Sequence, residues 1–313
     1  MTLTQLNAFV LVARLGSVKA AAKALQVSEP AVSQAVASLR QHLGDPLIVR
    51  QESSMALTPG GNRLLTLASQ MVSLGAEAEA AVRAAQGGPE QVRLVATSAM
   101  VEFVTAPLIE AFVKRSARTI DVSAGMASGE EMAVLVLNRL ADIALGPNLA
   151  RETSLTSEPI FRCKIVAVTS PRTQPTGSPA HWPWLVDPSG TDPTSDTHHL
   201  LRKLRVPESK IRVFPNQTAA WSAAADGSGV APAISHLVIH QVERGELHVV
   251  DTPATPLETC WYATTLPAER RSPATSNLRR FLRTPEAMQL LRVPTAGVPP
   301  SRFRPPVYVT IWS

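Results

Sequence analysis

A short stretch near the N-terminus combines polar side chains at helical spacing with an apolar stripe. The polar side chains are those of Glu29, Ser33, Gln34 and Ser38. They are mostly small and carry hydrogen-bond donors and acceptors, so they suit recognition of polar groups on a partner. The apolar stripe is spaced at intervals of four, three and four residues, which predicts a helix face that points inward. It consists of Val32, Val36, Leu39 and Leu43.

Two predicted helices position this stretch. Ser17 can cap a helix over residues 18–25, which has an apolar face and is followed by a tight break at 26–27. Ser28 can cap the next helix, where Glu29 suits the helix dipole and Pro30 loses no hydrogen bond in the first turn. Two short helices joined in this way are typical of a helix-turn-helix, although a three-helix packing module would show the same pattern.

The flanking segments favour the helix-turn-helix interpretation. Residues 4–15 have the spacing of an amphipathic helix, and Gly44 can end the helix that begins after Ser28. Residues 46–50 and 55–57 are predicted to form two short strands around a polar turn, which would be a wing. Thr58 and Pro59 then provide the cap and first-turn proline of a further helix.

The first sixty or so residues closely resemble the DNA-binding domain of the LysR-type transcriptional regulators. The resemblance rests on Leu6, Phe9, Gly16, Ser17, Ala21, Ala22, the run 27–33, Leu39, Leu43, Gly44, Leu47, Arg50 and the run 57–61. It implies a winged helix-turn-helix over residues 1–58 that binds double-stranded promoter or operator DNA. The DNA-binding residues that it implies are Ser17, Ser28, Glu29, Pro30, Ala31, Ser33, Gln34, Ser38 and Arg50.

Three positions depart from the family pattern. Glu29 stands where the family usually has glutamine, Arg40 where glutamate usually follows the leucine, and Ile48 where the wing usually has phenylalanine. A carboxylate at position 29 can accept a hydrogen bond from cytosine N4 but is repelled by phosphate. We therefore expect an unusual operator preference and an unchanged fold.

The next segment, residues 59–88, is predicted to be a linker helix and hinge. Its apolar residues recur at alternating spacings of three and four, which is a heptad seam. A helix that lies on its own domain would be an alternative, but the resemblance implies a helix that pairs two chains into a homodimer or homotetramer. The predicted dimerisation residues are Leu64, Leu67, Met71, Leu74 and Ala78, with Ala81 and Ala85 continuing the seam.

From residue 91 onward the pattern changes to strands alternating with helices, which predicts an α/β domain with a mainly parallel sheet. The order resembles the family's effector domain, with two lobes like those of periplasmic solute-binding proteins linked by two crossing strands. We expect this domain over residues 89–292. Lobe 1 would comprise about 91–167 and 266–292, and lobe 2 about 168–265.

A small polar or anionic effector is expected at the carboxyl ends of the strands, often on a helix N-terminus. The residues predicted to bind it are Thr97, Ser98, Met100, Ser189, Gly190, Thr191 and Asn216. The alternative is that Thr97 and Ser98 only cap a helix. Asp192 and Pro193 follow Thr191 where the family often has a basic residue, which puts a carboxylate contact there in doubt.

The remaining residues that could carry chemistry give no sign of an enzyme or a metal site. Neither an acid–base pair nor a nucleophile elbow is recognisable, so we expect no enzyme, cofactor or metal. His198 and His199 lack other ligands at metal-binding spacing, and Cys163 and Cys260 lie in apolar runs typical of reduced core residues. The rival interpretation is a solute-binding or enzymatic α/β domain whose N-terminal module serves oligomerisation.

The net charge of +5 equals the excess of eight arginines over three glutamates in residues 258–313. The DNA-binding prediction therefore rests on the motif and not on basic charge. With no apolar run of membrane-spanning length and no secretory signal, we expect a cytoplasmic protein. In the tail, 293–313, alternation after residue 306 predicts an edge strand, with a disordered tail as the alternative.

Overall fold

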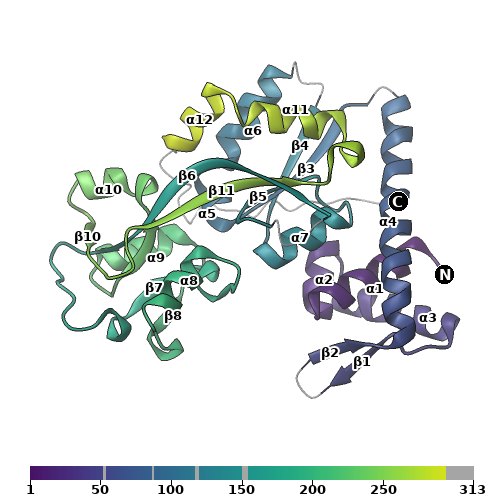
Figure 1. Ribbon diagram of the computed structural model, residues 1–313, viewed down its shortest axis with the longest axis horizontal. Coiled ribbons are helices and arrows are strands. Elements are labelled where there is room, and N and C mark those ends of the chain that lie inside the picture. The colour runs from purple at the N-terminus through teal and green to yellow at the C-terminus, as the bar shows by residue number, and fades with distance from the viewer. Residues whose placement is uncertain (52–53, 87, 117–119, 150–153, 294–313) are drawn as a thin grey trace. The chain divides into compact units, whose positions relative to one another are not determined.

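The computed structural model describes residues 1–51, 54–86, 88–116, 120–149 and 154–293. The predicted strand in the C-terminal tail therefore lies outside the described residues. The chain forms two compact units (Figure 1). The first comprises residues 1–90 with 130–141, and the second comprises residues 91–129 and the described residues from 142 onward. Among the described residues, no helix combines the length and apolar character needed to cross a bilayer.

The first unit begins with three helices, α1 (Leu3–Leu15), α2 (Val18–Leu25) and α3 (Glu29–Leu43). The predicted caps are confirmed, because the hydroxyls of Ser17 and Ser28 accept from the amides of Ala20 and Ala31. Gly44 ends α3 at a φ of 65°, which glycine adopts without strain. The helices share a core built around Leu6, Phe9, Val32, Val36 and Leu39.

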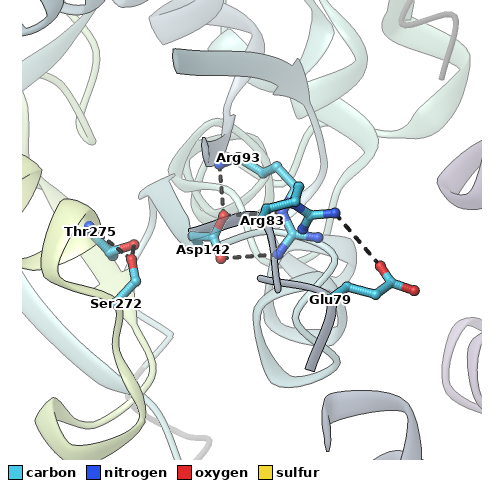
Figure 2. Close-up of polar contacts among 6 residues, drawn as sticks. All are labelled: Glu79, Arg83, Arg93, Asp142, Ser272 and Thr275. Atoms are coloured by element: carbon cyan, nitrogen blue, oxygen red, sulfur yellow. Dashed lines mark hydrogen bonds and ion pairs between the residues drawn. The ribbon is translucent and has the colours of Figure 1, made fainter. Parts of the chain in front are cut away.

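The inward orientation predicted for Leu43 is wrong, since this side chain is 41% exposed. Leu43 is the last residue of α3, directly before the glycine at which the chain turns away. The wing follows as β1 (Ile48–Gln51) and β2 (Ser54–Leu57), which pair antiparallel from Ile48–Leu57 to Gln51–Ser54. The long helix α4 (Pro59–Ala85) completes this part of the chain and carries an ion pair between Glu79 and Arg83 (Figure 2).

The second unit is built on one large sheet and one small sheet. The strands of the large sheet run in the order β10-β6-β11-β5-β3-β4, with β9 also paired to β6, and β7 pairs with β8 in the small sheet. Their bounds are β3 (Glu90–Ala96), β4 (Ile120–Met126), β5 (Ile143–Gly146), β6 (Thr156–Thr169), β7 (Trp184–Val186), β8 (Ile211–Val213), β9 (Ala231–Ile234), β10 (His248–Val250) and β11 (Leu257–Thr265).

The prediction of a mainly parallel sheet is wrong for the large sheet. In the described part of this sheet β3 and β5 pair parallel, whereas β6 and β11 pair antiparallel with each other and with β5, β9 and β10. The physical reason is that β6 carries the chain away from β3 and β5 and β11 brings it back, so the two long strands must run in opposite directions (Figure 1). Two crossing strands are nevertheless present as expected.

Helices complete two lobes around these strands. Lobe 1 holds β3, β4 and β5 with α5 (Ser98–Phe103), α6 (Thr105–Arg115), α11 (Pro273–Phe281) and α12 (Pro285–Arg292), and lobe 2 holds β7 to β10 with α8 (Asp196–Lys203), α9 (Gln217–Ala225) and α10 (Ile239–Glu243). Helices α5 and α6 are separate, because the backbone at Val104 between them leaves helical geometry. Helix α7 (Gly129–Leu137) is grouped mostly with the first unit.

Apolar packing and a partly buried ion pair stabilise the second unit. One apolar core runs from lobe 1 into lobe 2, and the stacked rings of Phe103 and Trp221, with centroids 5.1 Å apart, belong to it. Asp142 at the start of β5 accepts from the backbone amide of Arg93 at 2.8 Å and from its guanidinium at 3.1 Å (Figure 2). This bidentate contact fixes the register of β3 beside β5.

Candidate functional site

The outer face of α3 is the first candidate site. Glu29, Pro30, Ala31, Ser33 and Gln34 are exposed, and Ser38 is partly exposed. The hydroxyls of Ser17 and Ser28 accept hydrogen bonds from the backbone amides of Ala20 and Ala31. These two serines therefore offer a partner mainly their own backbone and the first amides of the helices that they cap. The helix packs its apolar side into the core. The five exposed residues in its first two turns are therefore accessible to a partner.

The charge on this face is not positive. Glu29 lies in the first turn of α3, where its carboxylate suits the helix dipole, whereas Arg40 and His42 lie in the last turn. Arg50 lies in strand β1, opposite Met55, but its side chain is outside the described residues. Contacts of α3 with a polyanion would therefore depend on amides and hydroxyls at the helix start.

The wing is fastened to α3 and to α4 by specific polar contacts. The guanidinium of Arg40 donates to the carbonyl of Ile48 at 2.9 Å. Asp45 accepts from the amide of Leu47 at 2.6 Å and from the hydroxyl of Thr58 at 2.8 Å, and these donors lower the pKa of its carboxyl. Gly61 lies against Leu47 so closely that a Cβ there would be 2.1 Å from the Leu47 carbonyl oxygen. The departure at position 40 thus has a role, because it ties the wing to α3.

Helix α4 carries an exposed apolar row. Leu67, Met71 and Leu74 are exposed, and Leu74 is 62% exposed. Ala78, Ala81 and Ala85 continue the row and are also exposed, whereas Leu64 is partly buried. An apolar row of this length on a helix of twenty-seven residues is the surface expected of a helix that pairs with another helix.

The predicted effector-binding residues lie on both lobes. In lobe 1, Thr97 precedes α5 without a side-chain cap bond, and Ser98 donates to the carboxylate of Asp187. Met100 is fully buried in the core, so its side chain is not available to a ligand in this conformation. Ser98 of lobe 1 therefore contacts lobe 2 through Asp187, a residue that was not among the predicted effector-binding residues.

In lobe 2, the expected residues lie in the turn after β7 and at the start of α9. Ser189 also donates to Asp187, Gly190 is buried, and Thr191 is exposed with its hydroxyl bonded to the carbonyl of Pro188 at 3.0 Å. Asn216 caps α9, since its side-chain oxygen accepts from the amide of Ala219 at 2.8 Å. Ser189 and Ser98 thus meet at one carboxylate, whereas Thr191 and Asn216 make separate local contacts.

Sequence reasoning missed two buried carboxylates between the lobes, Asp187 and Glu102. Asp187 is 1% exposed and accepts from the side-chain amide of Gln217 at 2.9 Å, besides the two serines. Glu102 on α5 is 5% exposed and accepts from the amides of Gln217 and Thr218, at 3.2 and 3.1 Å, and from the Thr218 hydroxyl. The available signals were a glutamate inside an apolar run and an aspartate directly after a buried strand.

The electrostatics of Glu102 show the cost of this arrangement. Burial raises the pKa of its carboxyl, and the charge of Asp187 acts in the same direction. The three hydrogen bonds from Gln217 and Thr218 lower that pKa and so oppose the burial effect. Among the residues that the structure describes, the hydrogen-bond donors to both carboxylates are neutral groups, so hydrogen bonds and not an ion pair stabilise these carboxylates.

The cysteines and histidines singled out in the sequence form no comparable cluster. Cys163 pairs with Thr259 and Cys260 with Arg162 across β6 and β11, so the two thiols point to opposite faces. Burial raises the pKa of the Cys163 thiol to about 12. His198 and His199 bond to backbone carbonyls of Gly190 and Ser195, and within the described residues no group of three potential ligands could hold a metal ion.

The contact between Arg40 and the wing predicts the effect of Arg40→Met. This change keeps the apolar stem but removes the donor to Ile48, so amides of residues 48–51 should exchange faster by on the order of three- to tenfold. Hydrogen exchange followed by mass spectrometry measures this, with Arg14→Met on the exposed face of α1 as the control. Unchanged exchange in the wing would show that the Arg40 contact does not hold it.

Two family models match this chain. The model described as the bacterial regulatory helix-turn-helix protein, lysR family, matches residues 3–62, and the one described as the LysR substrate binding domain matches residues 85–285. The HTH-type transcriptional regulator MT0391 of Mycobacterium tuberculosis (strain CDC 1551 / Oshkosh) is 35% identical to the chain, over 100% of both sequences. CfxR of Cupriavidus necator is 28% identical, covering 90% of this chain and 91% of CfxR.

Solved structures show the same fold. The crystal structure of a full-length AphB variant superposes with a TM-score of 0.58 and 19% identity, covering 90% of this chain and 98% of AphB. CbnR, described as a LysR family transcriptional regulator, gives a TM-score of 0.52 at 20% identity with the same coverages. With a helix-turn-helix model on the first unit and a substrate-domain model over more than half of the chain, this protein belongs to the LysR family of DNA-binding transcriptional regulators.

Proposed function

We propose that this LysR-family regulator reads its operator with the exposed face of α3 and positions that face with the wing. The observation that carries the proposal is the exposure of Glu29, Ser33 and Gln34 on a helix whose other face is buried. Helices of this kind enter the major groove with their N-terminal residues toward the bases. Arg50 of the wing and the amides at the starts of α2 and α3 would contact phosphates.

The chemistry of the face suggests how the bases are distinguished. Glutamine can bond to adenine N6 and N7, and serine can donate or accept at several bases. A glutamate accepts but does not donate, so Glu29 favours cytosine N4 over the groups that a glutamine at this position would read. Ser38 and Ala31 border these residues and would limit how closely α3 approaches the groove.

Dimerisation through α4 is the second part of the proposal. Pairing Leu67, Met71, Leu74 and Ala78 with the same residues of a second copy would bury apolar surface that is exposed in the single chain. Two helix-turn-helix domains would then contact two related half-sites. Whether two such dimers assemble into a tetramer depends on surfaces outside α4.

The third part concerns a small-molecule effector that binds between the lobes and biases their packing. Thr97, Ser98, Ser189 and Thr191 contribute hydroxyls on its two sides. An anionic effector would have to approach Glu102 and Asp187, whose hydrogen-bond donors in the described part of the chain are neutral, so these two carboxylates favour a neutral or cationic polar effector. We propose no catalytic role for the two carboxylates, since neighbouring donors occupy both of them.

The base-reading role of α3 predicts that Gln34→Ala weakens binding to the DNA upstream of the regulator's own gene. Loss of one specific side-chain contact should lower affinity about five- to 150-fold, because such a contact contributes about 1–3 kcal/mol. Mobility shifts at two salt concentrations measure this, and the salt dependence should stay the same because glutamine carries no charge. Gln41→Ala, two turns further along α3, is the matched control. Equal weakening by both variants, or by neither, would contradict the assignment.

The pairing role of α4 predicts that Leu74→Glu shifts the protein toward monomers. A charged side chain at each copy of this position would place two carboxylates at a seam that must exclude water. Analytical ultracentrifugation over a concentration series measures the shift. Ile239→Glu, at an exposed apolar residue of α10, should sediment like the wild type. A Leu74→Glu protein with an unchanged association constant would place the dimer interface elsewhere.

A further inference from the structure

The start of α9 is occupied by a side chain from the other lobe. The first amides of a helix are free to bind an anion, and in α9 these belong to Gln217 and Thr218. Both donate to the carboxylate of Glu102, which comes from α5 of lobe 1. The hydroxyl of Thr218 donates to the same carboxylate. The protein itself therefore supplies the anion for this helix.

A second set of contacts joins the same two helices and the turn after β7. Asp187 of lobe 2 accepts from Ser98 on α5 and from the side chain of Gln217 on α9. Phe103, next to Glu102 on α5, stacks on Trp221 of α9 with nearly parallel rings, at an interplanar angle of 20°. Polar and aromatic contacts thus hold α5 to lobe 2 at three points, none of which requires a bound molecule.

We propose that Glu102 is an internal ligand of the effector domain: its carboxylate fills the position at the start of α9 that a free anion would take. In doing so it holds the lobes together without effector and excludes anionic effectors from that position. The regulatory meaning of this contact rests on the effector role proposed above. Glu102 is thereby a specificity-determining residue. The carboxylate of an effector would have to displace the Glu102 carboxylate, which the chain itself holds at the start of α9.

The physical basis is effective concentration and burial. A tethered carboxylate competes with a free one at a high local concentration, so millimolar anions in solution should not replace it. Its ionised form is costly to bury, and the donors of α9 offset that cost only while the lobes stay together. Separation of the lobes would return Glu102 to water. We call this contact a latch, because it holds the lobes together but can open at a limited cost in free energy.

The test uses the full chain, its Glu102→Ala variant and Glu110→Ala as the matched control, since Glu110 is an exposed carboxylate on the neighbouring helix α6. Hydrogen exchange is followed in segments 98–104 and 215–222, and small-angle scattering reports the overall dimensions. For Glu102→Ala we expect exchange on the order of tenfold faster in both segments, together with larger dimensions. The control should match the wild type.

Acetate is the probe for the vacated position. Replacing sodium chloride by sodium acetate at equal ionic strength should restore protection of segment 215–222 in Glu102→Ala, and should leave the wild type and the control unchanged. The proposal is overturned if acetate protects the wild type equally. It is also overturned if acetate fails to protect the variant, or if only segment 215–222 loses protection, because Glu102 would then be an ordinary helix cap.

A second variant covers the case in which Glu102→Ala does not fold. Thr218→Val keeps Glu102 and the size of the side chain but removes the hydroxyl that donates to it. It should also lose protection in both segments, by a smaller factor of about two- to fivefold. Unchanged exchange in segment 98–104 of this variant would contradict the latch. Hydrogen exchange and small-angle scattering are measured without DNA. These measurements therefore test the Glu102 contact even if the proposed operator binding fails its own test.

Discussion

The packing of α3 against the core of the first unit is the contact on which the DNA-binding half depends. Val32, Val36 and Leu39 are buried with Leu6 and Phe9, and this packing fixes which side of the helix faces outward. The exposed face can be small and polar only because the buried face supplies the stability. Polar contacts then position the wing. Arg40 and Asp45 hold its first strand between the end of α3 and the start of α4.

The second unit has a different requirement, which is to join two lobes across one contact. Its apolar core continues across the lobes, and buried carboxylates with neutral donors lie beside it. Such contacts contribute specificity of arrangement at a cost in desolvation, so they are suited to a state that ligands can shift. In this chain, the contact of Glu102 with the start of α9 would set the position of the lobes before any effector binds.

The sequence allowed most of the first unit to be predicted, because its signals are local. Ser17 and Ser28 cap the helices that they precede, Gly44 ends α3, and two short runs of strand-forming residues around a polar turn indicate the wing. Leu43 was misassigned because periodicity does not show where the packing partner of a helix ends. Arg40 was recognised as a departure, but its bond to Ile48 depends on the folded wing and has no local signal.

Prediction was weaker where the determinants are distant in sequence. Glu102 and Gln217 are 115 residues apart, so no pattern in either segment indicates that one binds the other. The antiparallel pairing of β6 and β11 follows from the path of the chain between lobes, which alternation of strands and helices does not reveal. The predicted effector residues were therefore close to the contact between lobes, whereas the two carboxylates that dominate it were not selected.

The most direct test of the account is selection of binding sites from random duplex DNA by the wild type and by Glu29→Gln. If the face of α3 reads bases, both proteins should enrich related half-sites that differ at one position. The wild type should favour cytosine there, and the variant should favour adenine, because glutamate accepts from cytosine N4 whereas glutamine pairs with adenine N6 and N7. Enrichment of identical sequences by the two proteins would contradict base reading by Glu29, and enrichment of none would contradict sequence-specific recognition by α3.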